Sequence, residues 1–463
     1  YFGIEGVYFV GRGMKAISDP LSIFRPDFAF RFHPLFFALE AILYRVFGLD
    51  PAAQLTTLLI FHLITVWLLF DFVCKLGVSR GASLLGSLFF LFLGSHWTLV
   101  FDISQVARLG AALFFLSSLR SFHHFLISKQ KSSYVISLLY FLASLGFGED
   151  SVILPAILCF LIVWVKGWNR SSIQQGFLTL PFFMVSLSYV LLSFSAGSAQ
   201  LWRLGMGPYM AVKMAYFFKD FLHFLIIPRP EFVTWVPFSS SIARLIPALL
   251  AGIFISLAFG FTRHNFPENR NAKLNLQFIF FALVWTLIAC LPYAARPTGG
   301  EWDWHSRYFY FTGMGICMIC GILSYGLWLR LQPASRVLKI GFGILLIFIW
   351  ALNLKTNLFM IHKLNLAKEV GENKETRPFI FSLENQLLAL YGTFKAFPEK
   401  TVLVIENSPY DLSRVKKILS TYYAFLPERI VVGNKEETQA VPMNPGENRV
   451  YLKWEGRMTG EVV

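Results

Sequence analysis

Charged side chains are scarce in this sequence of 463 residues, because Asp, Glu, Lys and Arg together make up only 15% of it. Soluble domains carry about 25% charged residues. Apolar residues instead reach 56%, and aromatic residues 17%. Apolar content this high excludes a disordered chain, and the lack of a Gly-X-Y repeat excludes a collagen-like one. The composition therefore predicts a polytopic membrane protein.

Cysteine is also scarce, and each of the five residues lies inside or at the end of an apolar run: Cys74, Cys159, Cys290, Cys317 and Cys320. Cys317 and Cys320 form a CxxC, but it falls within a long helix-like segment rather than beside other metal-binding side chains. We therefore interpret all five as small buried hydrophobic residues and predict no disulfide framework.

The net charge of +14 lies almost wholly in residues 1–359. There the basic residues are spread over short connections and form no single patch. That spread is typical of membrane loops, so we expect membrane lipids as neighbours and no nucleic acid as a partner.

Apolar stretches of about 20 residues, the length that crosses a bilayer, predict ten membrane-spanning helices. They cover residues 52–74, 82–97, 105–127, 133–148, 151–167, 175–196, 241–261, 276–295, 308–331 and 337–357. The expected fold is thus an all-α transmembrane module over residues 52–357.

The connections between these spans alternate in charge. Five of them are rich in Lys and Arg and hold Glu268 as their only acid, namely 75–80, 128–132, 166–174, 263–273 and 330–339. The alternate connections carry Asp102, Glu149, Asp150 and further acids. Because basic loops stay in the cytoplasm, both termini and these acids are predicted on the outer, periplasmic face of a bacterial inner membrane.

Two less regular segments, 34–49 and 207–227, contain charges among apolar and aromatic residues. Making either one a span would break the charge alternation, so both are interpreted as amphipathic helices at the outer interface. Residues 1–51 then form an external segment. Since it begins at Tyr1 and lies outside, we expect a preceding span or a cleaved signal.

Residues 358–463 change character, with more charges and with alternating strand-like and helix-like segments. Strands are predicted at 401–406, 429–432 and 449–454, and helices at 376–395 and 411–425. This pattern indicates a small external α/β domain. It has neither a Gly-rich phosphate loop nor a metal-ligand spacing, so an accessory or acceptor-docking role is the default.

Candidate functional side chains gather where the chain meets the outer membrane surface, where ionisable groups are costly and often functional. They are Glu5, Arg31, His33, Glu149, Asp150, Arg296, His305 and Arg307. The competing interpretation of each is a water-facing charge or a helix cap. Arg307, next to Tyr308 at the start of a span, is the least suited to that interpretation.

The segment HSRYFYFTGMGICMICGIL (305–323), preceded by LPYAARP, resembles the RYLYLPSIGF-type segment of GT-C superfamily membrane glycosyltransferases. It is most similar to the O-mannosyltransferase-like branch that often bears tetratricopeptide repeats. Three other stretches resemble that branch in the same order: FRPDFAFRFHPLFFALEAILYRVFGLDP (24–51), HWTLVFDISQVARLGAALFFL (96–116) and GEDSVILP (148–155).

The resemblance implies an inverting transferase that uses a polyprenyl-phosphate-linked sugar. Glu5 would be the base toward an acceptor of unknown identity, although the family's acid pair is broken here by Gly6. Glu149 and Asp150 would position sugar hydroxyls or the base. The lipid phosphate would be held by Arg307 with the remaining basic residues: His305, Arg296, Arg31 and His33.

Two other classes of function stay open. The broken acid pair and Gly148 in place of the family's lysine favour a non-catalytic GT-C-fold scaffold or lipid-binding subunit of a larger membrane complex. A transporter would instead need mid-span charges and inverted repeats, for which the sequence gives no clear sign. No organic cofactor is expected, and the dispersed acids leave divalent-metal dependence undecided.

Overall fold

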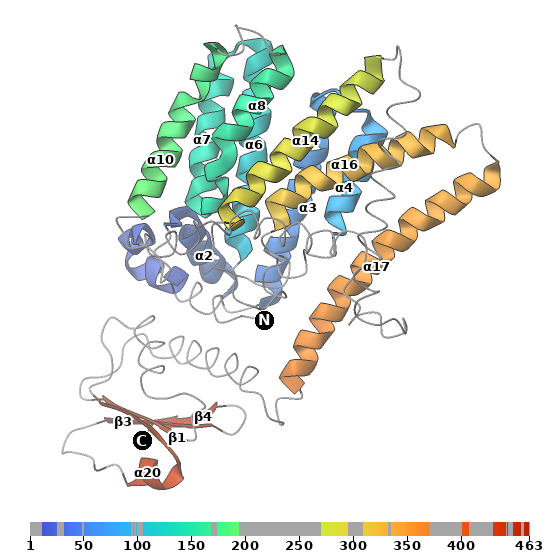
Figure 1. The fold of residues 1–463 in the computed structure, drawn as a ribbon. Coiled ribbons are helices and arrows are strands. Elements are labelled where there is room, and N and C mark those ends of the chain that lie inside the picture. Colours follow the sequence, from blue (N-terminus) through green and yellow to red (C-terminus); the bar gives the residue numbers. More distant parts are fainter. Residues whose placement is uncertain are drawn as a thin grey trace.

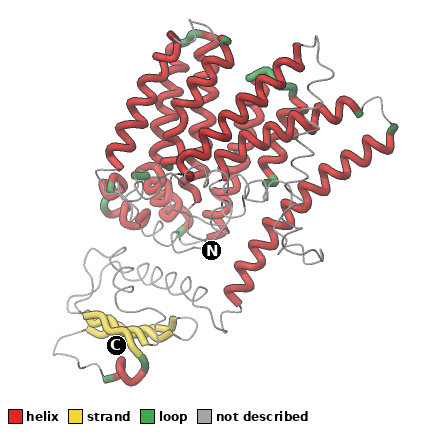
Figure 2. The backbone as a smooth tube through the Cα atoms, in the orientation of Figure 1, coloured by secondary structure: helices red, strands yellow, loops and turns green. Residues whose placement is uncertain are grey.

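The computed structural model describes most of the predicted helical region and part of the C-terminal region. The described residues are 12–25, 32–48, 51–93, 96, 99, 105–167, 174–193, 270–294, 309–331, 335–369, 401–406, 429–440, 442, 448–454 and 458–462. They are mostly helical and include one small sheet (Figures 1 and 2).

The helix expected over 34–49 is present as α2 (Pro34–Phe47). Proline at its first position suits a helix start, and Gly48 ends it with φ +62°, a left-handed value that favours glycine. Its buried face carries Glu40, whereas Ile42 and Val46 are exposed. The rest of the buried face is apolar, with Phe36, Phe37 and Leu43. Before α2 lie a helical turn over 12–18 and η1 (Pro20–Phe24).

The other helical elements overlap the predicted spans within the described residues. They are α3 (Pro51–Lys75), α4 (Arg80–Leu91), α6 (Val106–Ser128), α7 (Lys131–Phe147), η4 (Glu149–Ile153), α8 (Leu154–Lys166), η5 (Phe177–Thr179), α10 (Leu180–Ser193), α14 (Arg270–Ala294), α16 (Phe309–Arg330) and α17 (Arg336–Glu369).

Four helices within the described ranges are long and apolar enough to cross a membrane: Ala52–Lys75, Gln174–Ser193, Phe309–Arg330 and Arg336–Lys355. They indicate a membrane protein. Shorter apolar helices lie at Arg80–Leu91, Lys131–Phe147 and Gln277–Leu291. The expected segments 207–227 and 241–261 lie outside the described residues, and the count of ten spans stays a prediction.

Two predicted spans are shorter in the structure than the sequence suggested. The span expected over 82–97 ends at Leu91. The span expected over 151–167 begins as the tight 3-10 turn η4, and α8 starts only at Leu154. Pro155 explains the second difference, because a residue without an N–H can occupy the first turn of a helix but cannot continue one.

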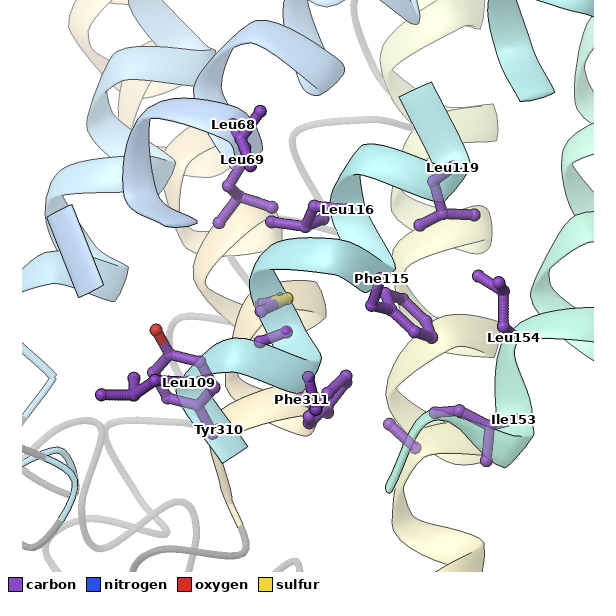
Figure 3. Close-up of a cluster of buried hydrophobic side chains, with 14 of the residues drawn as sticks. Leu68, Leu69, Leu109, Phe115, Leu116, Leu119, Ile153, Leu154, Tyr310 and Phe311 are labelled. Carbon is purple, nitrogen blue, oxygen red and sulfur yellow. The ribbon is translucent and has the colours of Figure 1, made fainter. Parts of the chain in front are cut away.

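The core of the helical part is centred on α6, which packs against α7 and α3. Phe115, Leu116 and Leu119 of α6 are fully buried. Figure 3 shows these side chains with Tyr310 and Phe311, from the first turn of α16, beside the start of α6. The first turns of α6 and α16 are therefore held in one apolar cluster.

The C-terminal strands form a sheet of order β2-β1-β3-β4, with β1 (Thr401–Glu406), β2 (Arg429–Gly433), β3 (Asn448–Trp454) and β4 (Met458–Val462). β1 runs parallel to β2 and β3, and β4 is antiparallel to β3. The three predicted strands are confirmed, whereas β4 and α20 (Lys435–Gln439) were not predicted. The helices expected at 376–395 and 411–425 lie outside the described residues. α17 continues to Glu369, past the expected domain boundary at 357.

Candidate functional site

Two consecutive acids, Glu149 and Asp150, lie in η4, directly after the last turn of α7. Gly148 has an extended backbone that ends α7 and opens this turn. Each carboxylate meets a different basic residue from a distant part of the chain. Glu149 Oε2 lies 2.6 Å from His33 Nε2, and Asp150 Oδ2 accepts a hydrogen bond of 2.7 Å from Arg108 Nε. The tight turn therefore brings two acid–base pairs together.

The Arg108–Asp150 pair is buried, with side-chain exposures of 10% and 5%. Arg108 also donates a hydrogen bond of 2.7 Å to Oε1 of Gln105, which is the residue just before α6. Among the described residues, Asp150 Oδ1 is buried and has no hydrogen-bond partner. The arginine neutralises the charge of the carboxylate. One acceptor oxygen therefore remains available.

The His33–Glu149 pair is almost as well shielded, with side-chain exposures of 4% and 14%. His33 precedes α2, and its ring lies edge-on to Phe36. Within the part of the chain that the structure describes, the second ring nitrogen, Nδ1, is buried without a partner. A carboxylate that fixes one nitrogen of an imidazole and leaves the other unengaged can orient it for proton transfer.

A third acid, Glu40, lies on the buried face of α2. Its side chain is inaccessible to solvent, and both carboxylate oxygens lack partners among the residues placed by the structure. The backbone of Glu40 packs against Gly13, where a Cβ would come within 2.8 Å of it. Desolvation by burial raises the pKa of the Glu40 carboxyl from 4.5 to about 8. Glu40 is therefore mostly protonated at neutral pH.

The structure brings together three of the predicted site residues, His33, Glu149 and Asp150. The others lie outside the described residues: Glu5, Arg31, Arg296, His305 and Arg307. Sequence reasoning missed Arg108 and Glu40. Arg108 carried a usable signal, because it is an ionisable residue inside the predicted span 105–127. Glu40 carried the same signal in an apolar segment.

No group of three or more His, Cys, Asp or Glu side chains that could hold a metal ion occurs within the described ranges. Metal dependence therefore stays open. The five cysteines are free thiols, and Cys290, Cys317 and Cys320 are buried on α14 and α16. Their interpretation as small buried residues is confirmed for these three.

No protein-family model, curated protein or solved structure matches this chain. The geometry of η4 and its partners is therefore the structural basis for a functional proposal. The resemblance to GT-C glycosyltransferases stays a prediction.

Proposed function

We propose that this chain is a GT-C-type membrane glycosyltransferase that takes a sugar from a polyprenyl-phosphate donor at the outer face of a bacterial inner membrane. The observation that carries the proposal is the His33–Glu149 pair beside Asp150. One buried atom of each pair, His33 Nδ1 and Asp150 Oδ1, lacks a partner among the described residues. A substrate hydroxyl, which both donates and accepts hydrogen bonds, suits such atoms.

In the proposed reaction, the acceptor oxygen bonds to the anomeric carbon of the sugar while the bond from that carbon to the phosphate oxygen breaks. The configuration at the anomeric carbon inverts. The acceptor proton passes to a base, and polyprenyl phosphate leaves with the bonding electron pair. His33, oriented by Glu149, is the base that the contacts support. Glu5 is the base that the family resemblance implies.

The leaving phosphate needs a cation, and the sequence offers one in Arg307. Its planar guanidinium can donate two parallel hydrogen bonds to phosphate oxygens. His305, Arg296 and Arg31 are proposed to assist it. We expect Arg307→Lys to lower transfer strongly with little effect on folding, because lysine keeps the charge but loses the paired donors.

The proposed topology has ten spans and places both termini in the periplasm, with η4 at the same face. Its support is the alternation of charge between connections. Consistent with it, Figure 1 has α2 and the sheet at the same end of the helical part.

The test measures transfer of radiolabelled sugar from a panel of polyprenyl-phosphate sugars by the purified chain, with bacterial membranes as the acceptor source. Glu149→Gln should lower the rate by about 10²-fold or more, the usual effect of disabling a general base. Asp71→Asn is the matched control. Asp71 is also ion-paired, to Lys75 and Arg120, but it lies near the C-terminal end of α3 and not in η4. Equal rates for the two variants would contradict the proposed site.

A second candidate function is a non-catalytic scaffold of the same fold, favoured by one observation. Both acids of η4 are already paired with basic side chains. Such pairing is what is expected of acids whose role is to stabilise the fold. Replacing one partner of a buried pair costs about 3–5 kcal/mol, whereas replacing both with apolar residues is often neutral. Arg108→Leu should therefore destabilise the protein, and Arg108→Leu with Asp150→Leu should restore it.

The restored double variant separates the two functions. If Asp150 positions the sugar, the variant is stable but transfers little sugar. If the chain is a scaffold, the wild-type protein binds polyprenyl phosphate yet transfers no sugar from any donor in the panel, and the double variant binds it equally well.

A further inference from the structure

α10 contacts both segments of the proposed catalytic pair through two residues of one face. The hydroxyl of Ser186 donates a hydrogen bond of 3.2 Å to the carbonyl oxygen of Val152, inside η4. One turn later, the hydroxyl of Tyr189 donates a hydrogen bond of 3.1 Å to the carbonyl oxygen of Phe32, the residue directly before His33. Residues three positions apart in a helix lie on the same face. One helix therefore bonds to the segment that carries the imidazole and to the turn that carries the carboxylate.

The two accepting carbonyls occupy the same position, one residue before a helix cap. Phe32 precedes His33, the N-cap of α2, and Val152 precedes Ile153, the N-cap of α8. The carbonyl of an N-cap residue accepts the first hydrogen bond inside the helix, so the carbonyl before it lies outside that series. Val152 cannot use a 3-10 bond instead, because residue 155 is a proline and has no N–H. In both places a hydroxyl of α10 is the partner.

A single stripe of α10 faces the other helices. Its buried residues recur about once per turn: Phe182, Ser186, Tyr189 and Ser193. Exposed apolar side chains occupy the outer faces: Phe183, Met184, Leu187, Leu191 and Leu192. Figure 1 shows α10 at the edge of the helical part. The inner stripe is thus the part of α10 that can act on the site, and the two hydroxyls at its centre bond to segments of that site.

η4 also has an anchor on the side of α6 and α7. The hydroxyl of Ser144, near the end of α7, donates a hydrogen bond of 2.6 Å to the carbonyl oxygen of Ala111 in α6. Since that hydroxyl has one proton, Ser151 of η4 donates to its oxygen, at 2.5 Å. Both serines are fully buried. α7 and α10 therefore hold η4 between them, and α10 extends this hold to the start of α2.

We infer that Ser186 and Tyr189 are positioning residues, which hold the His33 imidazole against the Glu149 carboxylate. This inference rests on the proposed function, in which that pair is the general base. The pair joins segments 116 positions apart, and its nitrogen and oxygen are 2.6 Å from each other. A hydrogen bond weakens steeply when its geometry is distorted. Because one helix bonds to both segments, a displacement of α10 moves them together rather than apart.

The first test measures whether the pair stays shielded, and it needs no enzymatic activity. Diethylpyrocarbonate modifies accessible imidazoles, and peptide mapping by mass spectrometry gives the modification rate of each histidine in the purified full chain. His33 is 3% exposed and should react slowly in the wild type. Tyr189→Phe keeps the ring but removes the bond to Phe32, so His33 should react several-fold faster. His62, 2% exposed on α3, should stay protected and is the internal control.

Tyr134→Phe is the matched control variant. The Tyr134 hydroxyl donates a hydrogen bond of 2.9 Å to the Leu178 carbonyl, near the start of α7 and thus at the end of that helix opposite η4. This variant should lose about as much thermal stability as Tyr189→Phe, but it should leave His33 protected and the rate of sugar transfer unchanged. Tyr189→Phe should lower kcat about tenfold, because a misplacement of about 1 Å can cost ~10²-fold.

Ser186→Ala is the second variant, and it replaces Tyr189→Phe should that protein fail to fold. It removes the bond to Val152 and should likewise raise the reactivity of His33 and lower kcat. A double-mutant cycle then tests whether these hydroxyls act through the pair. In a Glu149→Gln background either substitution should cause little further loss of kcat, since the effects of coupled residues are not additive.

The outcomes distinguish the two proposals. A wild-type chain that transfers no sugar overturns the proposed function, and the positioning of the pair then stands or falls by the protection of His33 alone. The positioning role is overturned, with the proposed function intact, in either of two cases. In the first, Tyr189→Phe and Ser186→Ala leave His33 as protected as it is in the wild type. In the second, their losses of kcat add to that of Glu149→Gln.

Discussion

A glycine contact between α4 and α16 gives a prediction that is independent of function. A Cβ added at Gly321 would lie 2.5 Å from the Ala82 carbonyl oxygen and would also collide with the backbone of Gly86. Real Cβ atoms do not approach backbone atoms so closely, and neither backbone can move without displacing its helix. We therefore expect Gly321→Ala to force α4 and α16 apart.

The magnitude follows from two opposing terms. Overpacking a well-packed interface costs about 1–3 kcal/mol, whereas replacing a helical glycine by alanine gains about 0.5–1 kcal/mol. Gly326, on the same helix, is the matched control because a Cβ there would meet nothing within 4 Å. Gly326→Ala should thus be neutral or stabilising. Because both variants gain this propensity term, it cancels, and the two variants should differ by about 1–3 kcal/mol, the cost of overpacking.

Reversible unfolding in mixed micelles, followed by tryptophan fluorescence, measures this difference in the free energy of unfolding. Gly321→Ala should be the less stable variant by that amount. Equal stability of the two variants would refute the close approach of α4 and α16.

Two further predictions concern Glu40 and the topology. The folded-state pKa of Glu40 is raised from 4.5 to about 8, so its contribution to stability is full below pH 4.5 and is lost as the pH rises to about 8. The melting temperature of the wild type should therefore fall between pH 5 and pH 8, and Glu40→Gln should flatten that fall. An unchanged pH profile would contradict the burial of this carboxyl. The charge alternation predicts that a cysteine introduced at Asn269 reacts with a thiol reagent only from the cytoplasmic side, and labelling from the periplasmic side would reverse the proposed orientation.

The helices and strands could be predicted where composition changes sharply along the chain. TVLVIE is a short β-branched run between polar segments, and it forms β1 over the predicted residues. The end of α4 was placed too late because Phe92 and Leu93 continue the apolar run beyond Leu91, so hydropathy gives no signal there. β4 was missed because MTGEV contains too few β-branched or aromatic residues to stand out as a strand.

The contacts of the candidate site were much less predictable. His33 and Glu149 are 116 positions apart, and no periodicity links residues so far apart in sequence. Arg108 and Asp150 are 42 positions apart and lie on different elements. Sequence reasoning could place His33, Glu149 and Asp150 near one membrane face. Which acid meets which base depends on how α2, α6 and η4 pack, and packing is set by the whole bundle.

The unsatisfied atoms at η4 are the feature of this turn that a bound ligand would explain. A structural ion pair gains most when every buried oxygen and nitrogen is satisfied, because each buried polar atom left without a partner costs about 1–3 kcal/mol. His33 Nδ1 and Asp150 Oδ1 are both left so among the described residues. A fold selected only for stability would remove this cost by an apolar replacement of the Arg108–Asp150 pair. Retaining the cost is understandable if a ligand hydroxyl satisfies these atoms when it binds, which is the role that the proposed transferase gives them.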